Sequence, residues 1–188
     1  MLKVELMSLN NISTERLQIN EITESDFDII FKVDSIPECA EYNTIGIPED
    51  IEVTRKLYMS YLDDQKNELR TKYCWIVQLK TGEQIGVAGM SDSLDRFKIG
   101  EIYYKLIPEF WGKGYGTEVS KTLIKFGFEV LKLHRVEAGV ATGNHASIRV
   151  LEKSGMLREG LHRKILPIRG KWIDNYHYAI VEDEYESS

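Results

Sequence analysis

Residues 109–118, "EFWGKGYGTE", place three glycines and a lysine between an aromatic pair and the start of an apolar helical pattern. The stretch follows the strand-like segment "IGEIYYKLI" (99–107), so it connects a strand to a helix. The first amides of a helix lack partners within the helix, and a turn that leads into them can bind an anion. Glycine adds left-handed backbone angles and lets phosphate oxygens approach the main chain.

The spacing of these glycines matches neither of the two common nucleotide-binding patterns. Both GxGxxG and GxxxxGK[ST] require other intervals, so a dinucleotide fold and a nucleotide triphosphatase are disfavoured. Lys113 adds a positive charge to the turn. A plain connection between strand and helix explains the glycines equally well, and the surrounding sequence has to decide between the two interpretations.

Two helices are predicted after the glycine turn. From Tyr115 onward, Val119, Leu123, Phe126 and Val130 recur at the spacing of one helical face. Residues 144–155, "NHASIRVLEKSG", predict a further helix in which Asn144 is the N-cap and Gly155 the C-cap.

Two more helices are predicted in the first third of the chain. "SDFDIIFKVD" (25–34) follows a capping pair formed by Thr23 and Asp26. "IPEDIEVTRKLYMSYLDDQK" (47–66) forms the second, with a proline near its first turn, where proline is tolerated. The proline is Pro48, and the residues expected to face inward are Val53, Leu57 and Leu62.

The remaining apolar segments predict strands. Those segments are 15–22, 72–79, 83–92, 99–107, 135–140, 157–165 and 171–181, with hairpin turns at 80–82 and 167–170. We therefore expect an α/β (α+β) sandwich: one mixed, mostly antiparallel central sheet of about six to seven strands, flanked by about four helices. No repeat or linker interrupts this order, so residues 1–188 are expected to form a single domain.

Composition and net charge limit the classes of function that the chain could have. With 188 residues, 43% of them hydrophobic, the chain can bury one sizeable core. The net charge of -6 is the wrong sign for neutralising nucleic acid, and it suits a cationic partner better. No segment approaches a membrane span and the N-terminus does not resemble a signal peptide, so we expect a soluble, cytoplasmic protein without nucleic-acid or membrane partners.

The cysteines and histidines predict no metal site. Cys39 and Cys74 match neither a zinc spacing nor a CxxC pair, and both are interpreted as ordinary buried thiols. The four histidines form no i, i+4 pair and no triad with a nucleophile, so no catalytic role is assigned to them. They are His134, His145, His162 and His177.

Two long segments, "EIYYKLIPEFWGKGYGTEV" (101–119) and "HRVEAGVATGNHASIRVLEKSGM" (134–156), closely resemble the GNAT superfamily of acetyl-CoA-dependent N-acyltransferases. Within it the sequence is most similar to the branch of the ribosomal-protein N-terminal acetyltransferases. The resemblance continues through "STERLQINEITESDF" (13–27) and "REGLHRKILPIRGKWIDNYHYAI" (158–180), so it covers most of the chain in order. It implies a GNAT-like fold and acetyl-CoA as the cofactor.

The resemblance also implies where acetyl-CoA binds. The glycine turn would give its amides to the pyrophosphate, and the strand ending at Leu106 would separate from the one beginning at Arg135 to receive the pantetheine arm. Trp111 departs from the commoner Gln or Arg of the superfamily, although tryptophan is familiar in this branch. The implied cofactor-binding residues are Leu106, Ile107, Trp111, Gly112, Lys113, Gly114, Tyr115, Gly116, Thr117, Asn144, Ser147, Arg149 and Lys153.

Two residues are the candidates for catalysis. Glu101 matches the acidic position at which a carboxylate of this branch takes the proton of the amine, although a solvated strand carboxylate is the alternative. Ser147 matches a serine near the acyl-CoA sulfur, although a small helical residue without a role is the alternative. Leu151 stands where many GNAT enzymes have a tyrosine general acid, so that mechanism is in doubt here.

The function expected from the resemblance is transfer of an acetyl group to a primary amine, most simply a protein or peptide N-terminal α-amine. A small cationic amine, such as a polyamine or an aminoglycoside, is the alternative, as is a non-catalytic acyl-CoA sensor. Acceptor identity is expected to depend on the loops 36–50 and 91–98 and on the terminal strands. The aromatic residues Tyr42, Trp75, Tyr103 and Tyr104 either line an acceptor slot or belong to the core. The sequence leaves open whether the protein is a monomer or a homodimer.

Overall fold

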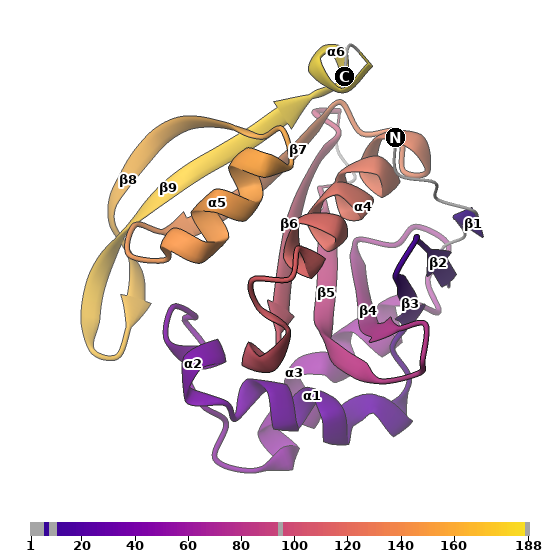
Figure 1. The fold of residues 1–188 in the computed structure, drawn as a ribbon, viewed down its shortest axis with the longest axis vertical. Helices are drawn as coiled ribbons and strands as arrows, with labels where there is room; N and C mark the ends of the chain where they lie inside the picture. The colour runs from indigo at the N-terminus through magenta and orange to yellow at the C-terminus, as the bar shows by residue number, and fades with distance from the viewer. Residues whose placement is uncertain (1–5, 8–10, 94–95, 187–188) are drawn as a thin grey trace.

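A computed structural model describes residues 6–7, 11–93 and 96–186 of the chain. Its strands form one sheet in the order β1-β2-β3-β4-β5-β6-β7-β9-β8 (Figure 1). Their bounds are β1 Leu6–Met7, β2 Asn11–Ser13, β3 Leu17–Glu21, β4 Lys72–Leu79, β5 Gln84–Asp92, β6 Ile99–Leu106, β7 Arg135–Ala141, β8 Leu157–Ile168 and β9 Lys171–Val181. Neighbouring strands are antiparallel, with the exception of the parallel pair β6 and β7.

The seven predicted strands are all present, and the fold class is confirmed. The described residues also include two strands that the sequence does not predict. β1 and β2 are only two and three residues long, too short to show an alternating pattern. β8 also extends beyond its predicted end, through Pro167 to Ile168. A proline is compatible with this position because β8 lies at the edge of the sheet. The turn therefore shortens to Arg169 and Gly170, both with positive φ.

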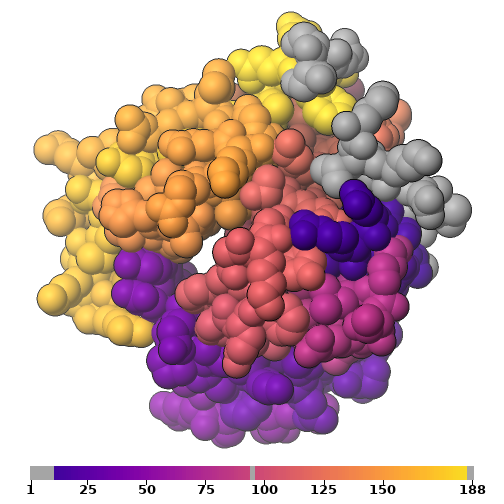
Figure 2. Space-filling model, viewed as in Figure 1, coloured from indigo at the N-terminus to yellow at the C-terminus, as the bar shows by residue number. Residues whose placement is uncertain are grey.

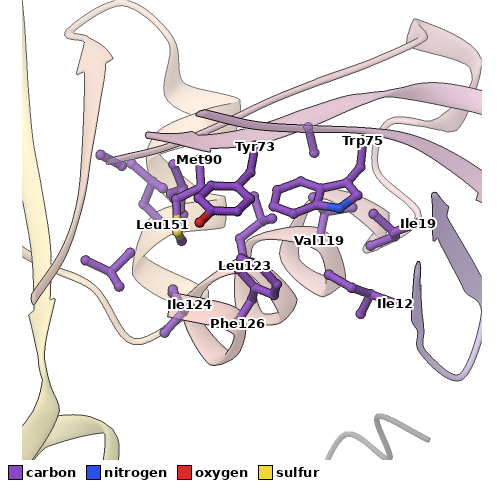
Figure 3. Close-up of a cluster of buried hydrophobic side chains, with 14 of the residues drawn as sticks. Ile12, Ile19, Tyr73, Trp75, Met90, Val119, Leu123, Ile124, Phe126 and Leu151 are labelled. Carbon is purple, nitrogen blue, oxygen red and sulfur yellow. The ribbon is translucent and has the colours of Figure 1, made fainter. Parts of the chain in front are cut away.

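Two hydrophobic clusters lie on opposite faces of the sheet. Side chains of a strand alternate between its faces, and β4 divides its residues accordingly. Tyr73 and Trp75 pack with Phe126 of α4 (Tyr115–Glu129) in the first cluster, which Figure 3 shows. Cys74 and Ile76 pack in the second cluster. Trp75 is therefore a core residue, fully buried, and lies in no acceptor slot.

The longer helices cover these two faces. α4 and α5 (His145–Lys153) pack on the first cluster, and α1 (Phe27–Asp34) and α3 (Ile51–Asp64) pack on the second. The short helices are α2 (Pro37–Ala40) and α6 (Glu182–Glu186), with 3-10 turns at Glu24–Asp26 and Pro108–Phe110. Within the described part of the chain, no helix is long and apolar enough to cross a membrane.

Helix α3 differs from its prediction. It begins at Ile51, because the Asp50 side chain accepts hydrogen bonds from the amides of Glu52 and Val53 and caps it. Pro48 consequently lies before the helix and not in its first turn. The inward face is formed by Thr54, Tyr58 and Leu62, at i, i+4 and i+8, so only one of the three predicted residues is buried. Val53 and Leu57 remain 36% and 37% exposed.

The ends of the other predicted helices agree closely with the structure. The pair Thr23 and Asp26 forms the expected capping box, here in front of the 3-10 turn that leads into α1. Asn144 caps α5 by accepting a hydrogen bond from the Ser147 amide. α5 ends one residue earlier than predicted, with Ser154 as its C-cap, and Gly155 follows with a φ of +90°.

The parallel strands β6 and β7 separate soon after they meet. Their register covers three pairs, which end at Glu101 and Glu137. Beyond this point β6 continues to pair with β5, and β7 with β9. The edges that β6 and β7 turn toward each other are therefore open, as the diverging strands in Figure 1 show.

Candidate active site

The glycine turn adopts the backbone that its sequence suggested. Gly112 and Gly114 have φ values of +72° and +83°, in the left-handed region where glycine is unstrained. A Cβ at Gly112 would meet no atom within 4 Å, so the backbone angle and not lack of space requires glycine there. Gly114 is the N-cap of α4, and no side chain caps this helix. The first-turn amides of Tyr115, Gly116 and Thr117 are thus left for a ligand.

Gly116 has a different reason to be glycine. It lies on the side of α4 that faces α5, and an added Cβ would come within 3.3 Å of Val150 Cγ2. The absence of a side chain lets the first turn of α4 approach the middle of α5. Gly116 therefore shapes the space between α4 and α5.

An ion pair between the half-exposed Arg16 and the buried Glu118 holds the glycine turn to the residues just before β3. Glu118, 5% exposed, accepts hydrogen bonds from Thr14 Oγ1 and Arg16 Nε, each at 2.6 Å. Arg16 Nη1 in turn donates to the Lys113 carbonyl at 2.9 Å. The guanidinium also lies over the Tyr115 ring, 4.5 Å from its centre. We call this set of residues the Arg16 latch; it connects a turn and a strand that are about a hundred residues apart in sequence.

A cavity of about 510 Å³ opens between the glycine turn and α5, and we call it the α4–α5 cavity. Its size is typical of ligand sites. His145, Arg149 and Lys153 line it from positions one helical turn apart on α5, so a basic stripe faces the glycines. The residues proposed from the sequence that line it are Leu106, Trp111, Gly112, Gly114, Gly116, Thr117, Asn144, Ser147, Arg149 and Lys153.

Three of the proposed cofactor-binding residues point their side chains elsewhere. Ile107 is 7% exposed and packs in the second hydrophobic cluster. The Lys113 ammonium lies 5.3 Å from the centre of the Phe110 ring. Tyr115 packs beneath the Arg16 guanidinium. Lys113 and Tyr115 therefore belong to the glycine turn through their main chain.

Trp111 connects the glycine turn to the end of β6. Its indole Nε1 donates a hydrogen bond to the Leu106 carbonyl at 2.6 Å, while 46% of the residue stays exposed. This bond satisfies the carbonyl at the point where β6 ends. Tryptophan in place of the commoner Gln or Arg consequently has a structural reason in this chain.

A second cavity of about 500 Å³ occupies the gap between the diverging strands, and we call it the β6–β7 cavity. Alternation along β6 places Glu101 and Lys105 on the face that carries the second cluster, and Tyr104 on the face of α5. The cavity is lined from both faces, so the gap passes through the sheet. Glu101 and Ser147 line it from opposite sides.

Glu101 is exposed to this cavity at the last β6–β7 pair. Loss of hydration near the cavity walls raises the pKa of its carboxyl group, and the carboxylate of Glu137 raises it further. His177 and the Gly139 amide act in the opposite direction and lower that pKa. The net effect is a pKa above the ordinary value, which brings the carboxylate closer to neutral pH as a proton acceptor.

Two histidines for which the sequence predicts no role also line the β6–β7 cavity. The rings of His162 and His177 stack with their centres 5.3 Å apart, and His177 Nε2 lies 3.4 Å from Glu137 Oε1. The two residues are 15 positions apart, on β8 and β9, and this spacing in the sequence does not predict their contact. Among the described residues, no group of three or more His, Cys, Asp or Glu side chains is arranged to hold a metal ion.

The segment around α2 closes both cavities on one side. Tyr42 packs against Gly143, where an added Cβ would lie 3.1 Å from the Tyr42 ring. Cys39 is half-buried, and its thiol donates to the Leu106 carbonyl at 3.4 Å. It lines both cavities, unlike the fully buried Cys74, so the interpretation of both as ordinary buried thiols is wrong for Cys39. Burial raises the pKa of the Cys39 thiol to about 11, so it remains protonated at neutral pH.

The two cavities meet at a small set of shared residues. Asn144 Oδ1 accepts from the Ser147 amide at 3.0 Å, and the Ser147 hydroxyl lies 3.0 Å from the Tyr104 hydroxyl. Lys105 is held beside them by an ion pair with the buried Asp34. Figure 2 shows the surface hollowed where α2, α5 and the start of α4 meet. The full shared set is Cys39, Tyr42, Tyr104, Lys105, Asn144 and Ser147.

The fold places two adjoining cavities side by side, and their linings differ in charge. Helix amides without intrahelical partners and a basic stripe line the α4–α5 cavity, an arrangement that suits a phosphate-bearing ligand, and a carboxylate lines the β6–β7 cavity. The model of the acetyltransferase (GNAT) domain matches residues 16–157, more than half of the chain, and the chain therefore belongs to the GNAT acetyltransferase family. It is an N-acetyltransferase that uses acetyl-CoA.

Individual relatives agree with this family. The chain is 32% identical over 174 residues to the uncharacterized N-acetyltransferase YoaA of Bacillus subtilis, covering 91% of this chain and 96% of that protein. The ribosomal-protein-S5-alanine acetyltransferase of Vibrio fischeri has a TM-score of 0.79 at 24% identity, covering 92% and 97%. The spermidine N-acetyltransferase of Vibrio cholerae, in complex with CoA and spermine, has a TM-score of 0.80 at 19% identity, covering 90% and 98%. At these identities the two structures show a shared fold.

Proposed function

We propose that the acceptor of this N-acetyltransferase is the α-amine of a protein or peptide N-terminus. The observation that carries the proposal is the number of carboxylates in the β6–β7 cavity: among the described residues that line it, Glu101 has the only one. One carboxylate matches one ammonium group. A polyamine carries several ammonium groups and needs a carboxylate for each one that is buried.

The chemistry of an α-amine also suits a single carboxylate of modest basicity. Deprotonation of an α-amine, with a pKa of about 8, costs about 1 kcal/mol at neutral pH, whereas a lysine-like amine costs about 4 to 5 kcal/mol. Glu101 is the proposed general base, and its raised pKa improves it for that task. The open main-chain edges of β6 and β7 offer hydrogen bonds to an extended ligand.

The residues fit acetyl-CoA, which when bound supplies the acetyl group as a thioester. The first-turn amides of α4 and the basic stripe of α5 would hold the phosphates, and the open strand edges with Asn144 would pair with the pantetheine arm. Ser147 would donate a hydrogen bond to the sulfur at the junction of the cavities. Glu101, on the other side of the gap, would take the proton of the amine.

A polyamine is the second candidate, because Glu38 and Glu41 line the α4–α5 cavity from the α2 side. These two exposed carboxylates could accept the distal ammonium groups of a ligand that enters past α2. The neighbour that was solved with spermine has the same fold, as does the neighbour named for a ribosomal protein. The fold alone therefore does not separate the two acceptors.

Steady-state kinetics with matched amines separates them. The acceptors are a short peptide with a free N-terminus, the same peptide blocked at its N-terminus and carrying one lysine, and spermine. We expect the free peptide to have the highest kcat/KM, at least about tenfold above the other two, because of the single carboxylate. A preference for spermine that is lost in the variant Glu38→Gln/Glu41→Gln would replace this proposal with the second candidate.

Three further expectations remain proposals. Residues 1–188 are treated as a single N-acetyltransferase domain, which the continuous nine-stranded sheet supports. A cytoplasmic location agrees with the use of acetyl-CoA. A monomer and a homodimer are both compatible with the exposed edge strand β8.

A further inference from the structure

Tyr104 and Ser147 form a pair of hydroxyl groups at the junction of the two cavities. Tyr104 comes from β6 and Ser147 from the first turn of α5, and their oxygens are 3.0 Å apart. Both residues line both cavities. The Ser147 amide is already engaged by Asn144 Oδ1, so the start of α5 is held in place beside the Tyr104 ring.

Counting hydrogens shows what such a pair can offer. Each hydroxyl has one hydrogen to donate, and the contact between the two oxygens consumes one of the two. If Tyr104 donates, the hydrogen of Ser147 is left for a ligand. Burial raises the pKa of Tyr104 to about 12, so the phenol keeps its proton and stays a donor at any ordinary pH.

We propose that Tyr104 is a positioning residue: its phenol donates to Ser147 Oγ and thereby orients the serine hydrogen toward the CoA sulfur. The inference rests on the proposed function, which places the CoA sulfur beside Ser147. No proton leaves Tyr104 in this account. Its contribution is a fixed direction of donation, since a serine hydroxyl otherwise rotates freely among its partners.

This arrangement gives the leaving sulfur a hydrogen bond despite the substitution on α5. Leu151, which stands where many GNAT enzymes have a tyrosine general acid, is 1% exposed and has no polar atom to donate. In this chain the phenol is on β6 instead, and it acts through Ser147, which donates to the sulfur. A hydrogen bond to a developing thiolate stabilises the charged form and lowers the pKa of the thiol.

The thiol of bound CoA provides a measurement that does not depend on turnover. Each variant is saturated with CoA, the solution is titrated with base, and the ultraviolet absorbance of the thiolate is followed against the CoA-free protein. We expect Ser147→Ala to raise the thiol pKa by about one unit and Tyr104→Phe by about half a unit, the size of one hydrogen bond gained or lost. Affinity for CoA should change by less than about threefold.

A double variant tests whether Tyr104 acts through Ser147. If it does, adding Tyr104→Phe to Ser147→Ala should change neither the acid dissociation constant of the thiol nor kcat by more than about twofold. Tyr73→Phe is the matched control, because it removes a buried phenol from the neighbouring part of the sheet whose hydroxyl donates to the Arg70 carbonyl. This control should leave the thiol pKa at the wild-type value.

The possible results separate this inference from the acceptor proposal. A wild-type thiol pKa in Tyr104→Phe, or full additivity of the two substitutions, would overturn the role of Tyr104. A thiol pKa unchanged in both single variants would place the sulfur elsewhere and overturn the inference together with the cofactor placement. A protein that fails to acetylate the free peptide but shows the expected thiol shifts would refute only the acceptor.

Discussion

Glu101 is held in a position where the folded protein disfavours its charge. The carboxylate lies at the last β6–β7 pair, with Glu137 as its cross-strand neighbour, and its pKa is raised by desolvation and by that neighbour. A folded-state pKa above the unfolded one means that the folded protein binds this proton more readily. The free energy of unfolding therefore decreases as the pH rises through the interval between the two values.

Replacement of Glu101 by glutamine should separate activity from stability. We expect kcat/KM to fall on the order of 100-fold, because the proton acceptor is lost, and the acidic limb of the pH–rate profile to disappear with it. The same variant should unfold at higher urea than the wild type at pH 7, and the difference should vanish at acidic pH, where the wild-type carboxyl is protonated in both states. An acidic limb that survives the substitution would show that another group is the base.

The Arg16 latch determines how the glycine turn is presented. Glu118 is buried, and its carboxylate oxygens accept hydrogen bonds from the Thr14 hydroxyl and the Arg16 guanidinium. Arg16 then fixes the Lys113 carbonyl. The turn is thus held from outside its own helix, which keeps the first amides of α4 directed at the cavity without a side-chain cap.

Glu118→Gln should loosen this connection at a measurable cost. We expect the free energy of unfolding to decrease by about 1 to 3 kcal/mol, less than for a fully buried pair because Arg16 is partly exposed, and the affinity for CoA to decrease as well. Glu52→Gln, which removes an exposed ion pair with Arg55 on α3, should change the free energy of unfolding by less than about 0.5 kcal/mol. Equal urea midpoints for the two variants would show that the latch contributes nothing.

Elements with strong local signals could be predicted from the sequence, and those without could not. Four-three-four spacing identified α4, and a capping asparagine identified the start of α5. The prediction for the inward face of α3 is wrong. The aromatic Tyr58 and the polar Thr54 pack inward, whereas the apolar Val53 and Leu57 stay partly exposed. Strands as short as β1 and β2 have too few residues to show a period.

The candidate site is a property of the whole molecule, and the sequence predicts only part of it. The glycine turn is contiguous in the chain, so its role could be inferred. Tyr104 and Ser147 are 43 positions apart, and His162 and His177 meet only because β8 pairs with β9. The separation of β6 from β7, which creates the second cavity, follows from how the entire sheet twists and pairs.

The measurement that tests the account most directly is calorimetric titration of the protein with acetyl-CoA. Wild-type protein should bind, and Gly114→Asp should bind at least about 100-fold more weakly, because it puts a negative charge at the head of α4 where the phosphates are expected. Gly82→Asp is the control: this glycine also has positive φ, but it lies in the β4–β5 turn, where an added Cβ would meet no atom within 4 Å. Unchanged binding by Gly114→Asp, or none by the wild type, would contradict the assignment of the glycine turn as the phosphate site.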